Sequence, residues 1–148
     1  MGILTDAQTL VTYVDNLKAA GASIAVTNTT KDLPASAGIF CDQYEEWQPG
    51  IEYKYKQPIR YQGMAYQVQQ KHVSQAHQPP DSEGMLAIYT PYPAPDRNMV
   101  YPYTYGMRVE IGMKELDPNG KTYTAIQGMA AQLNPPSELP AIFKEEAQ

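Results

Sequence analysis

Hydrophobic and polar residues alternate in short runs after residue 44, and this two-residue period is typical of β-strands with one buried face. The runs predict strands at residues 51–55, 59–61, 65–69, 86–89, 107–111 and 122–126. Gly63 and the sequence Asp117–Gly120 separate these runs with residue types that favour hairpin turns. Thirteen prolines, most of them after residue 48, disfavour long helices there. We therefore predict a mainly β protein with an N-terminal α-helix.

The N-terminal segment has a helical period instead. Thr5 followed by Gln8 matches a capping box and Gly21 supplies a C-terminal stop, so residues 6–20 are predicted to form the helix. Its apolar face consists of residues at helical spacing: Ala7, Leu10, Val11, Val14 and Leu17. Residues 23–27 alternate and predict a strand, whereas the small residues of 33–41 predict an irregular segment.

Anchor residues of the segment 47–92 recur in the same order after residue 100. The first copy contains Tyr53, Ile59, Gly63, Tyr66, Pro79-Pro80 and Ala87-Ile88-Tyr89, and the second contains Tyr103, Val109, Gly120, Tyr123, Pro135-Pro136 and Ala141-Ile142-Phe143. A repeat of this size is typical of one small supersecondary unit used twice. We expect one shared fold with a longer second hairpin, because eleven positions separate Val109 from Gly120 and four separate Ile59 from Gly63.

The repeat predicts four parts of the chain. Residues 1–43 form an N-terminal helical arm and an extended anchor segment, 44–92 a first β module, 93–100 a Pro-rich linker and 101–148 a second β module. Modules of this size lie near the lower limit of independent stability. We therefore expect a homo-oligomer, with a trimer favoured, whose anchor interface is the helix face Leu10, Val11, Val14 and Leu17. The alternative is that the helix packs on the first module of its own chain.

Charge and composition exclude several classes of function. The 148 residues carry a net charge of −5 and no run of Lys or Arg, so nucleic-acid binding is not expected. We recognise no signal peptide and no membrane span, which predicts a protein made and kept in the cytoplasm, or released by lysis or assembly. Cys41 is the only cysteine, and its role stays open. His72 and His77 lie in a polar stretch without a carboxylate between them, so neither a metal nor a cofactor is expected.

No catalytic arrangement is recognisable in the sequence. Glu45 and Glu46 invite comparison with a glycosidase, but a working pair faces across a cleft, whereas adjacent residues of a strand point to opposite sides. Two solvated charges are the simpler interpretation. We expect a protein that is not an enzyme.

The first copy resembles the chitin-binding type of carbohydrate-binding module, families five and twelve. The residues that carry this resemblance are Trp47-Gln48-Pro49-Gly50, Tyr53, Ile59, Tyr61-Gln62-Gly63-Met64-Ala65-Tyr66, His72-Val73-Ser74-Gln75-Ala76, Pro80-Asp81 and Tyr89. The versions found in bacteriophage structural proteins are the most similar, and the second copy resembles the family more distantly. The chain departs from the family pattern at Gln57-Pro58, at Gln78 and at the final Trp position, which is Tyr89 or Phe143.

The resemblance implies a surface on which sugars stack. Its candidate residues are Trp47, Tyr44, Gln75, Gln78, Tyr89 and Tyr92. Packing inside the protein is the favoured alternative for Trp47, and the departures at Gln78 and Tyr89 remove flat aromatic surface. The tyrosines Tyr101, Tyr103 and Tyr105 suit a neighbouring protein subunit as well as a glycan.

The function implied is that of a non-enzymatic bacteriophage virion protein, such as a capsid decoration, head-fibre or tail-associated protein. Its arm would anchor it to other virion proteins, and its modules would be displayed, with a bacterial surface glycan as a possible partner. The chain would be made in the host cytoplasm and end in the virion. Two alternatives stay open: a freestanding carbohydrate-binding module, and an assembly factor absent from the finished particle.

Overall fold

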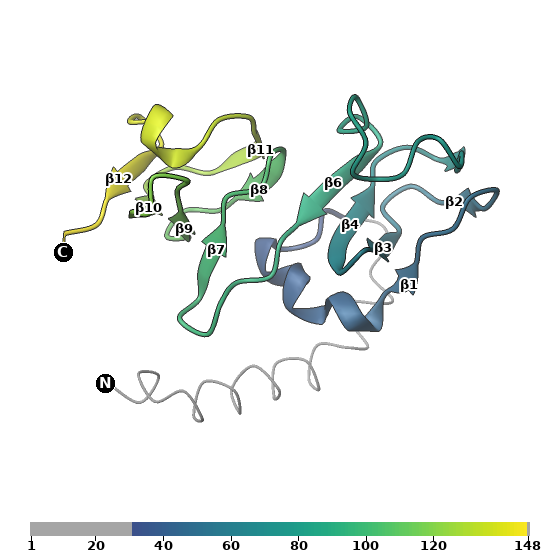
Figure 1. The fold of residues 1–148 in the computed structure, drawn as a ribbon, viewed down its shortest axis with the longest axis horizontal. Helices are drawn as coiled ribbons and strands as arrows, with labels where there is room; N and C mark the ends of the chain where they lie inside the picture. The colour runs from purple at the N-terminus through teal and green to yellow at the C-terminus, as the bar shows by residue number, and fades with distance from the viewer. Residues whose placement is uncertain (1–30, 148) are drawn as a thin grey trace.

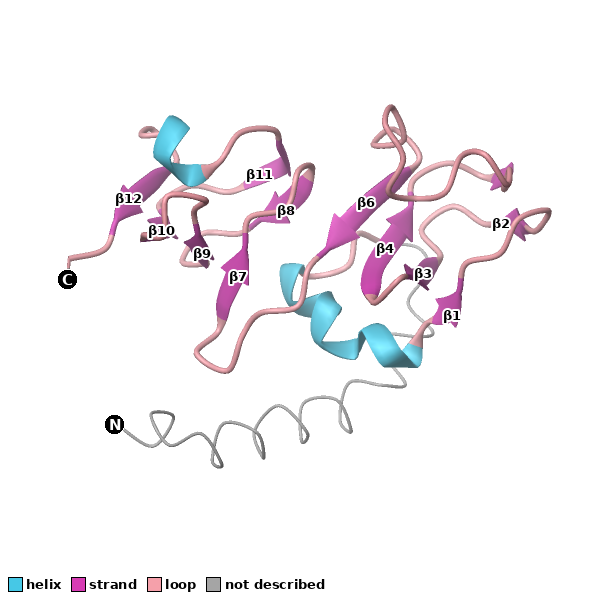
Figure 2. Ribbon diagram, in the orientation of Figure 1, coloured by secondary structure: helices cyan, strands magenta, loops and turns pink. Residues whose placement is uncertain are grey.

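The computed structural model describes residues 31–147, which form a mainly β protein (Figure 1). The first module contains β1 (Glu45–Glu46), β2 (Glu52–Tyr53), β3 (Pro58–Tyr61), β4 (Met64–Val68), β5 (His72–Val73) and β6 (Tyr89–Tyr92). The second contains β7 (Val100–Pro102), β8 (Met107–Val109), β9 (Lys114–Leu116), β10 (Thr122–Ala125), β11 (Met129–Gln132) and β12 (Phe143–Glu145). Two 3₁₀ segments, η2 (Ala35–Gln43) and η3 (Pro136–Glu138), complete the described part (Figure 2). Within it, no helix is long and apolar enough to cross a membrane.

The two modules have the same strand order. The first has a four-stranded sheet β1-β3-β4-β6 and a separate pair β2-β5, and the second has β7-β9-β10-β12 and the pair β8-β11. In each sheet the first pair is parallel and the other two are antiparallel. The prediction of two tandem small β modules is confirmed at this level. The predicted helix 6–20, the strand 23–27 and the interface residues Leu10, Val11, Val14 and Leu17 lie outside the described residues.

Backbone hydrogen bonds show which residues of the modules are equivalent. Trp47 N donates to Arg60 O (2.7 Å), and in the second module Tyr103 N donates to Leu116 O (3.2 Å). In the registers, Ile59 faces Tyr66 and Glu115 faces Tyr123. Thus Tyr103 takes the place of Trp47, and Glu115 that of Ile59.

The sequence alignment of the two copies was therefore right in one half and wrong in the other. Gly63 with Gly120 and Tyr66 with Tyr123 are equivalent, as predicted. Val109, however, stands opposite Met129 as Tyr53 stands opposite His72, so Val109 matches Tyr53 and not Ile59. The predicted long second hairpin is wrong for the same reason. Two residues separate the paired Tyr61 and Met64, and three separate Asp117 from Lys121, whose carbonyl accepts its N–H.

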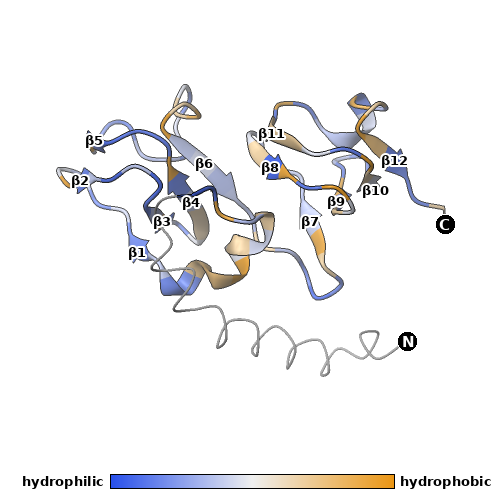
Figure 3. Ribbon diagram, turned by 180° about the vertical axis from the view of Figure 1, so that it is seen from behind, coloured by the Kyte–Doolittle hydropathy of each residue, from blue (hydrophilic) through white to orange (hydrophobic). Residues whose placement is uncertain are grey.

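Residues 31–44 pack on the first module. Leu33, Ala37 and Tyr44 form a buried cluster with Ala65 of β4 and Tyr92 of β6. The expectation of an extended or irregular segment is corrected here, because η2 is a 3₁₀ helix with a kink at Phe40. Figure 3 shows the apolar part of η2 against the sheet. The small residues of this segment are needed for the contact: a Cβ atom on Gly38 would overlap the carbonyl oxygens of Tyr92 and Pro93.

The buried side chain of Gln67 holds the start of this segment. Its Oε1 accepts a hydrogen bond from Leu33 N (3.0 Å), and its Nε2 donates to Lys31 O (2.7 Å) and Lys56 O (3.0 Å). The hydroxyl of Tyr92 donates to Leu33 O (3.1 Å). Since Gln67 is fully buried, these bonds replace the water it loses, and they fix the backbone of residues 31–33.

The same segment also contacts the second module, which we call the strap (residues 31–35) for that reason. Ala35 N donates to Glu110 Oε2 (2.8 Å), and Asp32 forms ion pairs with both Lys56 and Arg108. The modules lie side by side, with β6 next to β8 (Figure 1). The strap therefore joins two modules that the linear sequence separates.

Glu115 is the polar exception in the second module. It is fully buried, and among the described residues neither carboxylate oxygen has a hydrogen-bond partner. Gln132 is also fully buried, and its Nε2 donates to Asn134 O (3.0 Å) while its Oε1 lacks a donor. Burial raises the pKa of Glu115 to about 7, with the neighbouring Gln132 side chain opposing the shift and Asp117 adding to it. A protonated Glu115 can donate to Gln132 Oε1 and so satisfy both groups.

This pKa predicts the pH dependence of stability. Below pH 4.5 Glu115 is protonated in the folded and unfolded states, and its burial costs least. Between 4.5 and about 7 only the unfolded state releases the proton, so stability falls as pH rises, by about 3 kcal/mol in total. Denaturation of the full chain at pH 5 and pH 8 measures this loss. Glu115→Gln should remove it, whereas Glu145→Gln, an exposed change on the same sheet, should keep it. An unchanged pH profile in Glu115→Gln would show that Glu115 is not the titrating group.

Candidate functional site

The aromatic residues implied by the family resemblance are buried. Trp47, Tyr44, Tyr89 and Tyr92 are 8%, 3%, 0% and 2% exposed. Gln75 and Gln78 are exposed in the loop after β5. In this structure the four rings have no exposed face on which a sugar can stack, and only the two amides reach the surface.

A chain of hydrogen bonds explains the position of Trp47. Its Nε1–H donates to the hydroxyl of Tyr89 (3.0 Å), which lies 2.7 Å from Nε2 of His72. Nδ1 of His72 is 2.8 Å from Gln70 O, and a carbonyl only accepts. His72 therefore carries its proton on Nδ1, and Tyr89 donates to Nε2. Three polar groups of the core are satisfied in one direction, and Tyr61 packs edge-on against Trp47 at 5.3 Å between ring centroids.

The two other tyrosines of the set join the strap region to the sheet. Tyr44 donates to Ala37 O (3.1 Å), and burial, with a smaller effect of Cys41, raises the pKa of Tyr44 to about 12. Tyr92 donates to Leu33 O, and burial raises its pKa as well. Both rings thus have structural contacts.

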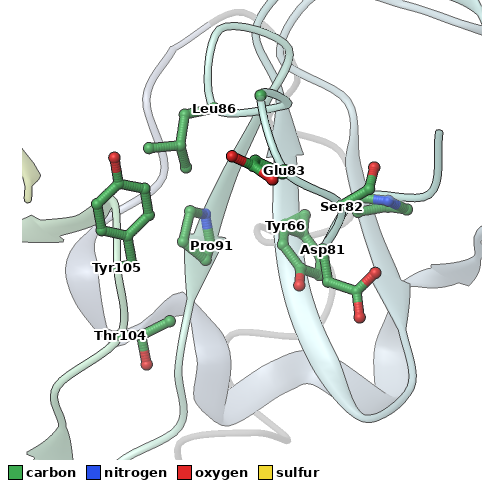
Figure 4. A pocket seen from close by; sticks show the side chains of 10 residues that line it. Tyr66, Asp81, Ser82, Glu83, Leu86, Pro91, Thr104 and Tyr105 are labelled. Carbon is green, nitrogen blue, oxygen red and sulfur yellow. The ribbon is translucent and has the colours of Figure 1, made fainter.

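A groove between the modules is the most developed surface cavity in the described part of the chain. It has a volume of about 360 Å³, in the lower range of small-ligand sites. Its lining consists of Tyr66, Pro80, Asp81, Ser82, Glu83, Gly84, Leu86 and Pro91 from the first module and Thr104 and Tyr105 from the second. We call it the inter-module groove. Figure 4 shows Tyr105 on one side and Tyr66 with Asp81 on the other, with Pro91 between them.

The apolar side of the groove is positioned by a close contact between the modules. Leu86 lies against Gly106, where a Cβ atom would overlap Leu86 Cδ2, and the φ angle of +87° there favours glycine in addition. Next to it, Tyr105 is 58% exposed. The residue that follows the exposed ring is thus fixed by packing, and the ring stands at the mouth of the groove.

The opposite side of the groove is acidic. Asp81 and Glu83 are exposed, and neither takes part in an ion pair among residues 31–147. Burial, followed by the nearby Asp81 carboxylate, raises the pKa of Tyr66 to about 12, so its hydroxyl stays protonated. Ser82 donates its hydroxyl to Pro79 O (2.6 Å). The groove thus offers carboxylate acceptors and a phenol beside apolar carbon.

Other chemical groups singled out in the sequence lie apart from this groove. Glu46 pairs with Arg60 (3.0 Å) on the surface, His77 is exposed, and Cys41 is half-buried in η2. Within residues 31–147, no three His, Cys, Asp or Glu side chains are arranged to hold a metal ion.

The sequence contained one signal for the groove and missed the rest. The segment Tyr101, Tyr103 and Tyr105 suggested a contact surface, and burial separates its members: Tyr101 is buried, Tyr103 half-buried and Tyr105 exposed. Asp81 and Glu83 gave no signal, because only the docking of the modules brings them opposite Tyr105. A scan against protein-family models gave no match, and a search of curated protein sequences gave no significant match.

The buried position of Trp47 predicts a loss of stability on truncation. Trp47→Ala should cost about 3–5 kcal/mol. Trp47→Phe keeps an aromatic ring but removes the donor to Tyr89, and should cost less, on the order of 1 kcal/mol for the hydrogen bond alone. Urea denaturation measures both. Tyr55→Ala, at a ring that is 55% exposed, is the control and should change little. A Trp47→Ala protein as stable as the wild type would contradict the core role.

Proposed function

We propose that this chain is a non-enzymatic structural protein of a bacteriophage virion, such as a capsid decoration, head-fibre or tail-associated protein. The N-terminal arm anchors it to other virion proteins, and the two β modules are displayed as a pair. The observation that carries the proposal is the strap, where Asp32 and Ala35 contact both modules directly after the arm. An arm that continues into such a strap transmits its position to both modules together.

The use of the aromatic residues favours contacts with proteins. Trp47, Tyr44, Tyr89 and Tyr92 stabilise the first module, so they are not free for sugar stacking. Display of a folded scaffold to neighbouring subunits does not need them at the surface. The family resemblance supports the fold and the viral setting of the proposal more than it supports chitin binding.

Two other functions differ in what they require. A freestanding carbohydrate-binding protein needs an exposed stacking ring, for which Tyr105 beside the inter-module groove is the available residue. An assembly factor shares the architecture but leaves the finished particle. Both are distinguished by where the protein is found.

Mass spectrometry of purified particles tests the proposal. We expect the chain in the particles at a fixed copy number, in the host cytoplasm during synthesis, and not as a secreted protein. Abundance in the lysate with absence from the particles would favour the assembly factor. A particle-free protein that binds chitin oligosaccharides would favour the carbohydrate-binding alternative.

The anchor function predicts the effect of a double substitution in the arm. Leu10→Asp with Val14→Asp places two charges on the apolar helix face expected from the sequence. Light scattering should show loss of the homo-oligomer, with a trimer expected for the wild type, while circular dichroism of the modules stays unchanged. The exposed change Asp15→Asn serves as the control. A wild-type chain that is a compact monomer at micromolar concentration would contradict this prediction.

A further inference from the structure

We propose that the inter-module groove is a docking site for an arginine side chain of a neighbouring protein subunit. This rests on the proposed function only in taking the partner to be another protein of the particle. Three properties of the groove lead to it: its charge, its apolar lining and its exposed ring.

The charge of the groove selects the sign of the partner. Asp81 and Glu83 lie on one loop without a cationic partner in the described chain, whereas Asp32, Glu46 and Glu110 elsewhere are paired. The whole chain has a net charge of −5, which adds to the attraction of a cation. An anionic ligand, such as a phosphate or an acidic sugar, is repelled by both carboxylates.

The apolar side selects a long cationic side chain over a small ion. Leu86, Pro91 and Pro80 provide carbon surface between the acidic loop and Tyr105 (Figure 4). The methylene stem of an arginine or lysine can pack on such a surface while its charged end reaches the carboxylates. A volume of about 360 Å³ suits one side chain with its flanking backbone.

The exposed ring favours arginine over lysine. Tyr105 is exposed by 58%, and its face stands across the groove from the carboxylates. A guanidinium is planar, stacks on aromatic rings and pairs with a carboxylate through two parallel hydrogen bonds. An ammonium is a compact, strongly hydrated charge and uses the ring less well.

The groove forms only when both modules are in place. Tyr105 and Thr104 come from the second module, and the acidic loop comes from the first. The contact of Leu86 with Gly106 sets the distance between them. A partner that binds here would therefore also hold the two modules together.

A titration of the full chain, followed by ¹⁵N NMR, tests the proposal. The probes are the peptide acetyl-Gly-Arg-Gly-amide and its matched neutral form, in which citrulline replaces arginine. We expect the arginine peptide to shift the amides of residues 81–86 and 104–106 with a Kd on the order of 1–10 mM, as suits so small a ligand. The citrulline peptide should bind at least fivefold more weakly, and added salt should weaken the arginine peptide further.

Variants of the full chain separate the contributions of charge and ring. Asp81→Asn with Glu83→Gln should weaken arginine binding about tenfold. Tyr105→Ala should weaken it several-fold and Tyr105→Phe much less, because the face of the ring is kept. The controls are Glu52→Gln and Tyr55→Ala, an exposed carboxylate and an exposed ring outside the groove, which should bind as the wild type does. Unchanged amide spectra away from the substituted residues confirm that each variant is folded.

Three outcomes would overturn the proposal. They are equal binding of the arginine and citrulline peptides, shifts confined to other parts of the chain, and the absence of shifts at about 10 mM peptide. A neutral chitin oligosaccharide that binds through Tyr105 but not through Asp81 or Glu83 would instead identify a sugar site. None of these outcomes bears on whether the chain is found in the particle, so the proposed function is tested separately.

Discussion

The buried amide of Gln67 is the constraint on which the arrangement of the two modules depends. A fully buried amide must have its hydrogen bonds satisfied, and here the partners are the backbone groups of Lys31, Leu33 and Lys56. Those bonds place the strap on the first module. From this position Asp32 and Ala35 reach the second module. The orientation of the modules thus follows from one polar side chain of β4 as well as from apolar packing.

The two modules solve the problem of core polarity in different ways. In the first, the polar atoms of Trp47, Tyr89 and His72 bind one another in sequence. In the second, Phe143 takes the place of Tyr89, and Glu115 that of Ile59, so a carboxyl group is buried where the first module has a hydrocarbon. Burial of an unpaired charge is costly, which is why a neutral Glu115 suits this site. Equal topology has thus been kept while the polar groups changed.

The sequence predicted what depends on local pattern and missed what depends on pairing. The β class, the duplication and the turns at Gly63 and Gly120 follow from alternation and from glycine in hairpins. The strand β9 was not predicted, because a buried glutamate interrupts its apolar pattern, and this also displaced the alignment of the two copies. The groove could not be predicted from either module, since its two sides meet only through the packing of Leu86 on Gly106.

The burial of the aromatic residues changes how the family resemblance bears on function. A Trp or Tyr in a small β module serves as core or as ligand platform, and sequence alone does not distinguish the two. Trp47 and Tyr89 are core here, each with its polar atom bonded to another buried group. Tyr105 has neither burial nor such a bond, although it follows Tyr103, the equivalent of Trp47, by two residues. In this chain the recognition surface has therefore moved from within a module to the boundary between two, where duplication creates a groove that a single module lacks.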